Sequence, residues 1–177
     1  MNSLDNVAIF LVKTVFDLYL FVLMVRLILA YAQANYFNPL VSFIIKMTQP
    51  LVAPLRRVVP NYRRIEFSTL ILIIVFELIK ISLLFLLTQG MPSLFMLLAV
   101  SLLETIKLLL QTFFYAILLQ ALMSWFQPGE TPATQVLRLL TAPVLNPLRR
   151  VLPVVHGFDL APIPALILLQ LCIILLP

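Results

Sequence analysis

Long apolar segments constrain this chain more than any other feature of its sequence. They cover approximately residues 7–31, 68–87, 102–125 and 160–176. An α-helix needs about 20 apolar residues to cross the roughly 30 Å of hydrocarbon in a bilayer. Of the 177 residues, 63% are hydrophobic and only 11% are charged, and the mean hydropathy is +1.11. A soluble domain could not bury so much apolar surface, so we predict an all-α, multi-pass membrane protein with four transmembrane helices.

The third apolar stretch is longer than a single crossing requires. It contains neither proline nor glycine from Ser93 to Trp125. As one helix it would measure about 50 Å, at ~1.5 Å per residue. We place the crossing at Leu102 to Trp125 and expect the preceding turns to tilt, protrude or lie at the interface. Because two helices would need a break that the sequence lacks, we predict one continuous helix.

The connections between the apolar segments differ in charge. A short uncharged turn near residues 88–92 joins the second and third segments, whereas the other two connections are long and basic. Lys and Arg accumulate in the cytoplasmic segments of membrane proteins. We therefore predict that both basic connections are cytoplasmic and that both termini lie outside.

The two basic connections share a motif, and this internal repeat is the strongest signal in the sequence. A shift of 93 residues aligns residues 50–60 with 143–153, and seven of the eleven positions are identical. An acid follows in both copies, Glu66 in the first and Asp159 in the second. Self-similarity at a fixed spacing indicates duplicated structural units. We predict two parallel helix–loop–helix repeats, residues 7–90 and 91–177, with two crossings each.

Each basic connection combines spaced prolines with an arginine pair. The prolines expected to shape the loops are Pro50, Pro54, Pro60, Pro143, Pro147 and Pro153. The paired arginines are Arg56, Arg57, Arg149 and Arg150. Proline fixes the backbone direction, and arginine among apolar residues can extend to the interface and bind phosphate with two N–H groups. The arginines are therefore either a topology signal without a ligand or a contact for anionic lipid or a partner.

Before the prolines, each connection contains an apolar-rich segment. Residues 38–48 fit a short amphipathic helix on the cytoplasmic membrane surface, and residues 134–141 are a weaker equivalent. We predict that both are interfacial amphipathic segments.

Three acid–base pairs lie inside the apolar segments. They are Lys13 with Asp17, Glu77 with Lys80, and Glu104 with Lys107. Their spacings place each pair on one helix face, and pairing reduces the cost of about 2.5–3.5 kcal/mol for a lone charge at the bilayer centre. We expect the pairs, like Gln111, Gln120 and Gln170, to join helices. The alternatives are an ion or proton path along Asp17, Glu77 and Glu104, or docking of a partner within the membrane. Arg26 has no such neighbour and is expected to extend to the cytoplasmic interface.

Signals of catalysis are absent from the sequence. It has no metal-ligand spacing, no nucleophile elbow and no glycine-rich nucleotide loop. The lone histidine, His156, could ligate haem in principle, but the first copy has Arg63 at the equivalent position. We expect no enzyme activity, no cofactor and no metal. The basic clusters lie beside apolar spans, so we expect anionic membrane lipids as partners and no nucleic acid.

The duplicated Pro-Leu-Arg-Arg-Val-x-Pro segment, the preceding Asn38-Pro39 and the acids Glu66 and Asp159 resemble the YggT family. The resemblance extends from about Leu11 to Leu175 and is to the two-repeat gammaproteobacterial type, which is related to the YlmG proteins. It implies a multi-pass protein of the bacterial cytoplasmic (inner) membrane. Relatives are linked to osmotic stress, to potassium homeostasis, to division and, in plastids, to haem attachment and nucleoid organisation.

Two functions are compatible with these features. The first is a non-enzymatic scaffold or assembly factor whose basic cytoplasmic face binds lipid or a division or assembly protein. The second is a small transporter or channel component for ions such as potassium. The motif is repeated whereas the charged pairs differ between the copies, which favours the scaffold.

Overall fold

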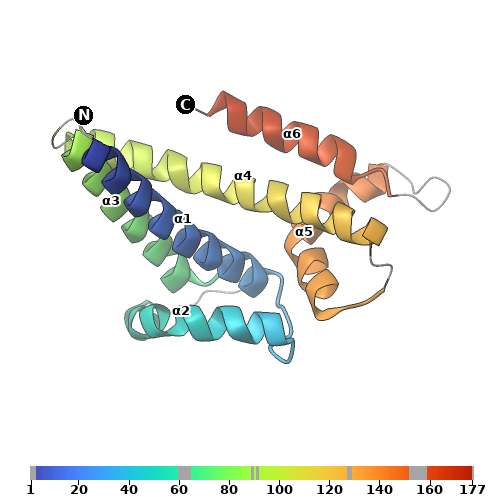
Figure 1. Cartoon of the computed structure of the whole chain (residues 1–177). Coiled ribbons are helices and arrows are strands. Elements are labelled where there is room, and N and C mark those ends of the chain that lie inside the picture. Colours follow the sequence, from blue (N-terminus) through green and yellow to red (C-terminus); the bar gives the residue numbers. More distant parts are fainter. Residues whose placement is uncertain are drawn as a thin grey trace.

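Within the part of the chain that the structure describes, six helices make up the fold and confirm the all-α class (Figure 1). The computed structural model describes residues 3–59, 65–88, 90, 92–126, 129–151 and 159–176. In chain order the helices are α1 (Ser3–Tyr31), α2 (Pro39–Val58), α3 (Phe67–Thr88), α4 (Leu94–Phe126), α5 (Pro132–Val151) and α6 (Pro162–Leu175).

Three of these helices are long and apolar enough to cross a membrane. The candidate spans are Asn6–Tyr31 in α1, Phe67–Thr88 in α3 and Leu94–Ser124 in α4. The first two match the predicted segments to within one residue at each end, whereas the third begins eight residues before the crossing predicted at Leu102. The fourth segment forms α6, which is apolar but has only 14 residues. At ~1.5 Å per residue it is about 21 Å long, shorter than the hydrocarbon of a bilayer.

α4 is one uninterrupted helix of 33 residues, as predicted. The turns before Leu102 continue the same helix, so no separate interfacial segment precedes the crossing. In Figure 1, α4 extends from the end where α3 finishes to the far side of the molecule, where α5 begins.

The basic connections, which we predicted to be loops, contain the helices α2 and α5. Each is a helix of 20 residues, and the bounds Pro39–Val58 and Pro132–Val151 differ by 93 residues at both ends. Pro50 and Pro54 lie inside α2, and Pro143 and Pro147 lie inside α5. These four prolines therefore do not shape loops. Pro60 and Pro153 lie outside the described residues.

Packing explains why these helices continue through their prolines. An interior proline removes one backbone hydrogen bond and normally kinks or breaks a helix. In α2, however, Val41, Thr48 and Val52 form a buried face, and tertiary packing supplies most helix stability in proteins. Pro50 and Pro54 lie on the exposed side. The carbonyls that lose a donor there remain accessible to water or to lipid head groups.

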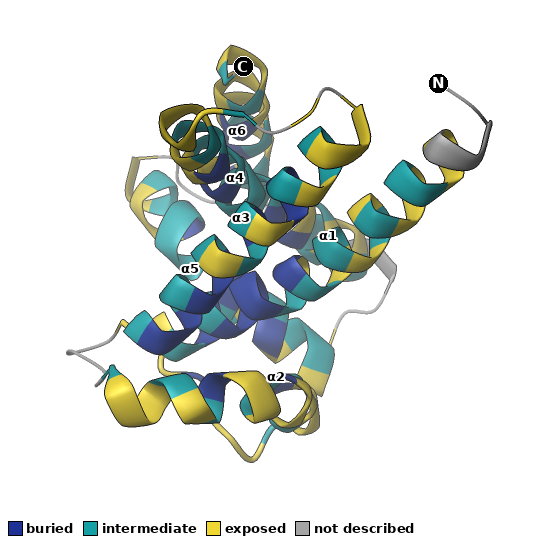
Figure 2. Ribbon diagram, turned by 90° about the vertical axis from the view of Figure 1, so that its left-hand side faces the viewer, coloured by how far each residue is buried: buried dark blue, intermediate teal, exposed yellow. Residues whose placement is uncertain are grey.

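The helices pack around two small cores. In the first, α1 lies along α3, and residues such as Leu23, Ile73 and Val136 join α1, α3 and α5. The second holds α4, α5 and α6 together and contains Ile117 and Leu145. Buried residues gather where the helices meet, whereas the outer ends of α1 and α6 are largely exposed (Figure 2). Most of the exposed residues there are apolar, as expected of surfaces that face lipid.

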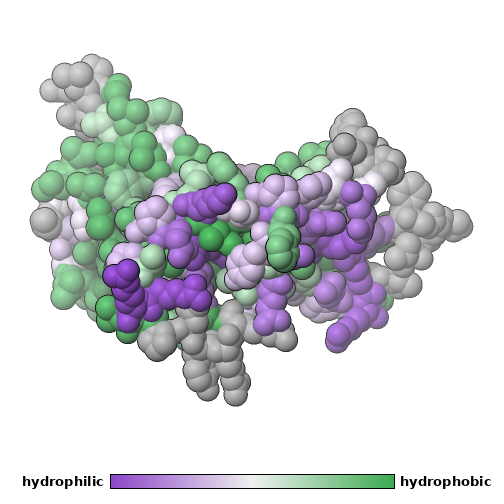
Figure 3. Space-filling view, turned by 90° about the horizontal axis from the view of Figure 1, so that it is seen from below, coloured by the Kyte–Doolittle hydropathy of each residue, from purple (hydrophilic) through white to green (hydrophobic). Residues whose placement is uncertain are grey.

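The side of the molecule that carries α2 is more polar than the rest. Viewed from below, hydrophilic side chains spread across this face, with hydrophobic ones concentrated toward one side (Figure 3). The N-terminal ends of α2 and α5 meet here, because Asn38 Nδ2 donates to the carbonyl oxygen of Pro132 at 2.9 Å. The same Asn38 caps α2 by accepting a hydrogen bond from Leu40 N–H at 3.0 Å.

Candidate functional site

Arg26 lies at the centre of a buried polar site between α1, α2 and α3. Nε and Nη2 donate to the two carboxylate oxygens of Glu66, at 2.9 Å each. Nη1 donates to Thr48 Oγ1 at 2.7 Å and to the Ile45 carbonyl at 3.5 Å, and Nη2 also donates to Gln49 Oε1 at 3.1 Å. All five guanidinium N–H groups thus have an acceptor. The expectation that Arg26 is unpaired and extends to the interface was wrong.

Glu66 is held ionised by this arrangement. Burial alone would raise the pKa of the carboxyl group, but hydrogen bonds from Arg26 and Thr69, with the charges of Arg26 and Arg56, outweigh it and lower the pKa. Thr69 Oγ1 donates to Glu66 Oε2 at 2.8 Å. Glu66 immediately precedes α3 and accepts the N–H groups of its first turn through its carbonyl. The ion pair therefore connects the start of α3 to the C-terminal part of α1.

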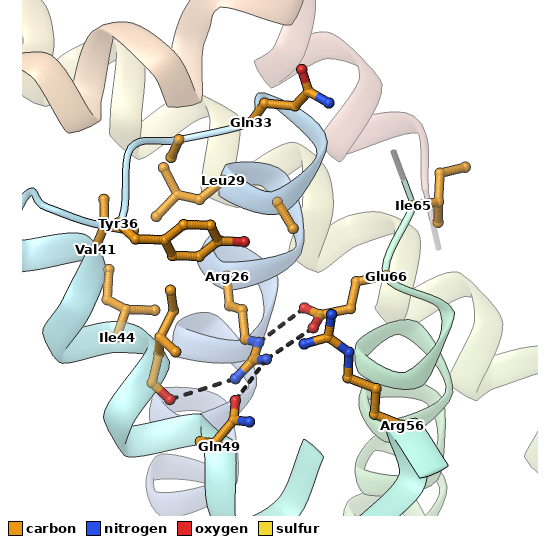
Figure 4. A pocket seen from close by; sticks show the side chains of 13 residues that line it. Arg26, Leu29, Gln33, Tyr36, Val41, Ile44, Gln49, Arg56, Ile65 and Glu66 are labelled. Carbon is orange, nitrogen blue, oxygen red and sulfur yellow. Dashed lines mark hydrogen bonds and ion pairs between the residues drawn. The ribbon is translucent and has the colours of Figure 1, made fainter. Parts of the chain in front are cut away.

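A pocket of about 460 Å³ opens beside this ion pair (Figure 4). The hydroxyl of Tyr36 points toward its interior, and Arg56 reaches it from the last turn of α2. One wall is aliphatic and includes Leu29, Val41 and Ile44. Among the described residues, Arg56 forms no hydrogen bond or ion pair. The pocket thus combines an apolar wall with an exposed cation whose donors have no partner in the described ranges.

The second half of the chain pairs its acid in another way. Asp159, which the 93-residue shift aligns with Glu66, accepts hydrogen bonds from Arg149 Nε at 2.8 Å and forms an ion pair with Nη2 at 2.7 Å. Its other oxygen accepts the Ala161 N–H at 3.1 Å. Both charged side chains are 31% exposed. Arg149 is the counterpart of Arg56, so the motif arginine is occupied in this half.

Two equivalent threonines also have different partners. Thr48 accepts a hydrogen bond from Arg26, whereas Thr141 donates to Gln120 Oε1 in α4. Both threonines are fully buried. Of the three glutamines predicted to join helices, Gln120 does so by this contact between α4 and α5. The threonine of the second half thus contacts a neutral amide of α4, whereas its counterpart in the first half contacts a charged arginine of α1.

The remaining motif arginines point outward. Arg57 and Arg150 are exposed and form no ion pair with any residue that the structure describes. The structure therefore does not gather the four motif arginines into one cluster. It distributes them as one pocket residue, one ion-paired residue and two exposed cations.

The intramembrane charges form a cluster in the first half of the chain. Lys80 Nζ donates to Asp17 Oδ1 at 2.9 Å and lies 2.7 Å from Glu77 Oε2. The second contact has the distance of an ion pair but lacks the alignment of a hydrogen bond. Glu77 and Lys80 are buried and confirm the predicted pair. Lys13 is exposed, and Asp17 pairs with Lys80 instead of with Lys13.

The third predicted pair is looser and lies in α4. Lys107 Nζ is 4.0 Å from Glu104 Oε1, and both side chains are partly exposed. At that separation the two groups attract each other without a direct hydrogen bond. Within the described ranges, no three His, Cys, Asp or Glu side chains gather as a metal site would require.

Reasoning from the sequence missed the most connected residue of the site, Arg26. The available signal was Glu66, because an acid aligned in two copies needs a basic partner in each. The 93-residue shift takes Arg26 to Leu119, so the repeat itself offered no second arginine to compare.

Three helices of membrane length, with an arginine-centred polar site near the ends of two of them, α1 and α3, define a helical membrane protein. The sequence model of the CCB3/YggT family matches residues 6–87 and again residues 99–177, and the chain belongs to this family.

Relatives cover most of the chain. It is 37% identical over 164 residues to the uncharacterised protein YggT of Escherichia coli K12, which covers 93% of this chain and 86% of that protein. It is 36% identical over 172 residues to an uncharacterised protein of Vibrio alginolyticus encoded in the proC 3′ region, covering 96% and 91%. A protein of Haemophilus influenzae is 31% identical over 167 residues, covering 94% and 89%. No solved structure matches the chain.

Proposed function

We propose that this chain is a non-enzymatic scaffold or assembly factor of the bacterial inner membrane, which binds anionic lipid or a protein partner at the face formed by α2 and α5. The observation that carries the proposal is the surface of α2. Its exposed apolar side chains recur every three or four residues beside the buried face: Leu40, Phe43, Met47 and Leu51. A helix that lies in a membrane interface presents such a stripe to lipid and its charged residues to water.

The arginine pairs support a role for this face. Arg56 and Arg57 occupy the last turn of α2, and Arg149 and Arg150 occupy the last turn of α5. Cations are favourable at helix C-termini, and guanidinium groups bind phosphate or carboxylate with paired N–H groups. Three of the four arginines form no ion pair with any residue that the structure describes, which leaves their donors for such a contact.

The proposal includes a membrane topology. Four crossings form two parallel repeats, residues 7–90 and 91–177, with α2 and α5 on the cytoplasmic side and both termini outside. The two matches to the family model start 93 residues apart, at residues 6 and 99, which supports the duplication. α6 is the fourth crossing, and local thinning of the bilayer accommodates its short length.

Replacement of all four motif arginines by glutamine tests the scaffold. In a strain that lacks its own copy of the gene, we expect the variant to insert normally and to lose the osmotic tolerance that the wild-type chain restores. Arg138→Gln is the control, because it removes an exposed basic charge of α5 outside the motif. Full tolerance with the inserted quadruple variant would overturn the proposal.

A second function, transport of ions such as potassium, is supported by the cluster around Lys80. Two carboxylates, Asp17 and Glu77, contact a single ammonium group, so a net negative charge remains when both are ionised. Such intramembrane groups often mark ion or proton pathways. Potassium and proton flux in proteoliposomes would then fall in Glu77→Gln and persist in Glu130→Gln, which changes an exposed acid. Flux no higher than in empty liposomes would exclude this function.

A further inference from the structure

The two motif arginines Arg56 and Arg149 occupy the same position but differ in availability. In the first half, Arg26 neutralises the acid Glu66, so Arg56 remains without a partner among the described residues. In the second half, Leu119 stands at the counterpart of Arg26, and Arg149 itself neutralises Asp159. Counting these described residues alone, the first site has one positive charge in excess, whereas the second is neutral.

The excess positive charge, that of Arg56, lies beside the pocket between α1, α2 and α3. Arg56 lines the pocket of about 460 Å³, a volume within the range of about 300–1,000 Å³ typical of ligand sites. The Tyr36 hydroxyl points into the same space, and Gln49 uses its oxygen for Arg26, which leaves its amide N–H₂ as a donor. An anion bound to Arg56 thus has further donors nearby. Arg26 itself has no free N–H group and serves as a support.

We propose that this pocket binds the phosphate of one anionic phospholipid through Arg56, with Tyr36 and Gln49 as additional donors. The inference rests on the proposed function, since it identifies lipid as the ligand of the α2 side. It also restricts the specific site to the first half of the chain. In the second half, the lipid would have to displace Asp159 from Arg149.

The surroundings of the pocket favour a lipid over a small soluble phosphate. The pocket walls include Leu29, Val41 and Ile44, which a hydrated phosphate cannot contact favourably. Ile65 lies at the pocket and is 41% exposed. On the adjacent face of α2, the exposed Phe43 and Met47 continue the apolar surface. An amphipathic anion matches both the cation and this apolar surface.

The test is lipid binding to the purified full-length chain in detergent, followed by native mass spectrometry. Dioleoylphosphatidylglycerol is titrated against wild type and three variants that each remove one motif charge: Arg56→Gln, Arg57→Gln and Arg149→Gln. We expect the dissociation constant of the first bound lipid to rise about tenfold in Arg56→Gln and less than about twofold in the others, because Arg56 is the one of these three arginines that donates to the phosphate.

Two further ligands separate headgroup charge from acyl chains. Dioleoylphosphatidylcholine has no net charge and should bind wild type about tenfold more weakly, and glycerol 3-phosphate has no chains and should not displace the bound lipid. Equal loss in all three arginine variants, or equal affinity for the two lipids, would overturn the proposal. Displacement by glycerol 3-phosphate would reassign the pocket to a soluble phosphate. Thermal unfolding confirms that each variant is folded.

Failure of this proposal is distinguishable from failure of the scaffold. If no specific lipid binds but the quadruple arginine variant still loses function, the basic face serves a protein partner and the pocket assignment is wrong. If the lipid binds through Arg56 but the quadruple variant functions normally, the site is real and the scaffold role is wrong.

Discussion

The first three helices and the last three neutralise equivalent acids with different arginines. Glu66 pairs with Arg26, which comes from the neighbouring helix α1 and is buried with 5% of its side chain exposed. Asp159 pairs with Arg149, which comes from the preceding helix α5 and is 31% exposed. The site of Arg26 and Glu66 joins three helices and leaves the motif arginine Arg56 out of the ion pair. The pair of Arg149 and Asp159 joins two helices, and the motif arginine itself is its cation. The same motif therefore has a structural role in one half and an available cation in the other.

Among the changes that test this difference between the halves, removal of Arg26 should lower the unfolding free energy most. Arg26→Leu leaves Glu66 buried without its cation, so we expect a loss of about 3–5 kcal/mol in unfolding free energy. Unfolding in mixed detergent micelles measures the change. Because the cost comes mainly from the unpaired charge, Arg26→Leu combined with Glu66→Leu should recover most of the stability. A single variant as stable as wild type would show that the pair is not structural.

Acid should weaken the first half through Glu66. Its pKa is lower in the folded chain than its ordinary value of 4.5, so its contribution is complete above that value and is lost as the pH falls through the lower, folded pKa. The effect is smaller than that of Arg26→Leu because the neutral carboxyl can still accept hydrogen bonds. Unfolding measured from neutral to acidic pH should show a gap between wild type and Glu66→Gln that closes in acid. A constant gap would contradict the assignment.

The equivalent threonines Thr48 and Thr141 allow the two halves to be compared by matched substitutions. Thr48→Val removes an acceptor from a buried guanidinium, and we expect a loss of about 2 kcal/mol, since hydrogen bonds to charged groups are the stronger ones. Thr141→Val removes a neutral contact with Gln120 and should cost about 1 kcal/mol. The same unfolding assay, applied to both variants, tests the difference. Equal losses would mean that the charge of Arg26 contributes little at Thr48.

Arg149→Gln should have the smallest effect on stability. Because the pair with Asp159 is partly exposed, its loss is expected to cost about 1 kcal/mol or less. The control is Arg150→Gln, an exposed neighbour without a partner among the described residues, for which we expect a change within about 0.5 kcal/mol. A loss in Arg149→Gln as large as that in Arg26→Leu would remove the distinction between the two halves.

The features of the fold that were predictable from the sequence are those set by local hydropathy. The three long spans and the continuity of α4 follow from apolar runs without proline or glycine. The helices through Pro50 and Pro143 were not predictable, because the rule that proline breaks helices is local and the buried face that overrides it is tertiary. The same 20-residue length of α2 and α5 nevertheless matches the 93-residue shift found in the sequence.

The candidate site was predictable only where partners are close in sequence. Glu77 and Lys80 are three residues apart on one helix face and pair as expected. Arg26 was missed because its partners Thr48 and Glu66 follow it by 22 and 40 residues. Spacing along one helix predicts which two charges share a face. It cannot predict whether another helix brings a competing ion-pair partner to that face. For Asp17, that competitor is Lys80.

The length of α4 has a mechanical consequence. At about 50 Å it exceeds the roughly 30 Å of a bilayer interior, so within a membrane it must lean or protrude, and a thinner bilayer makes it lean further. α5 and α6 both pack on α4, whereas α2 packs on α1 and α3. A change in the inclination of α4 therefore moves α5 relative to α2. Asn38 contacts Pro132 where the N-terminal ends of α2 and α5 meet. A change in bilayer thickness would therefore shift the two arginine-bearing helices relative to each other at this contact.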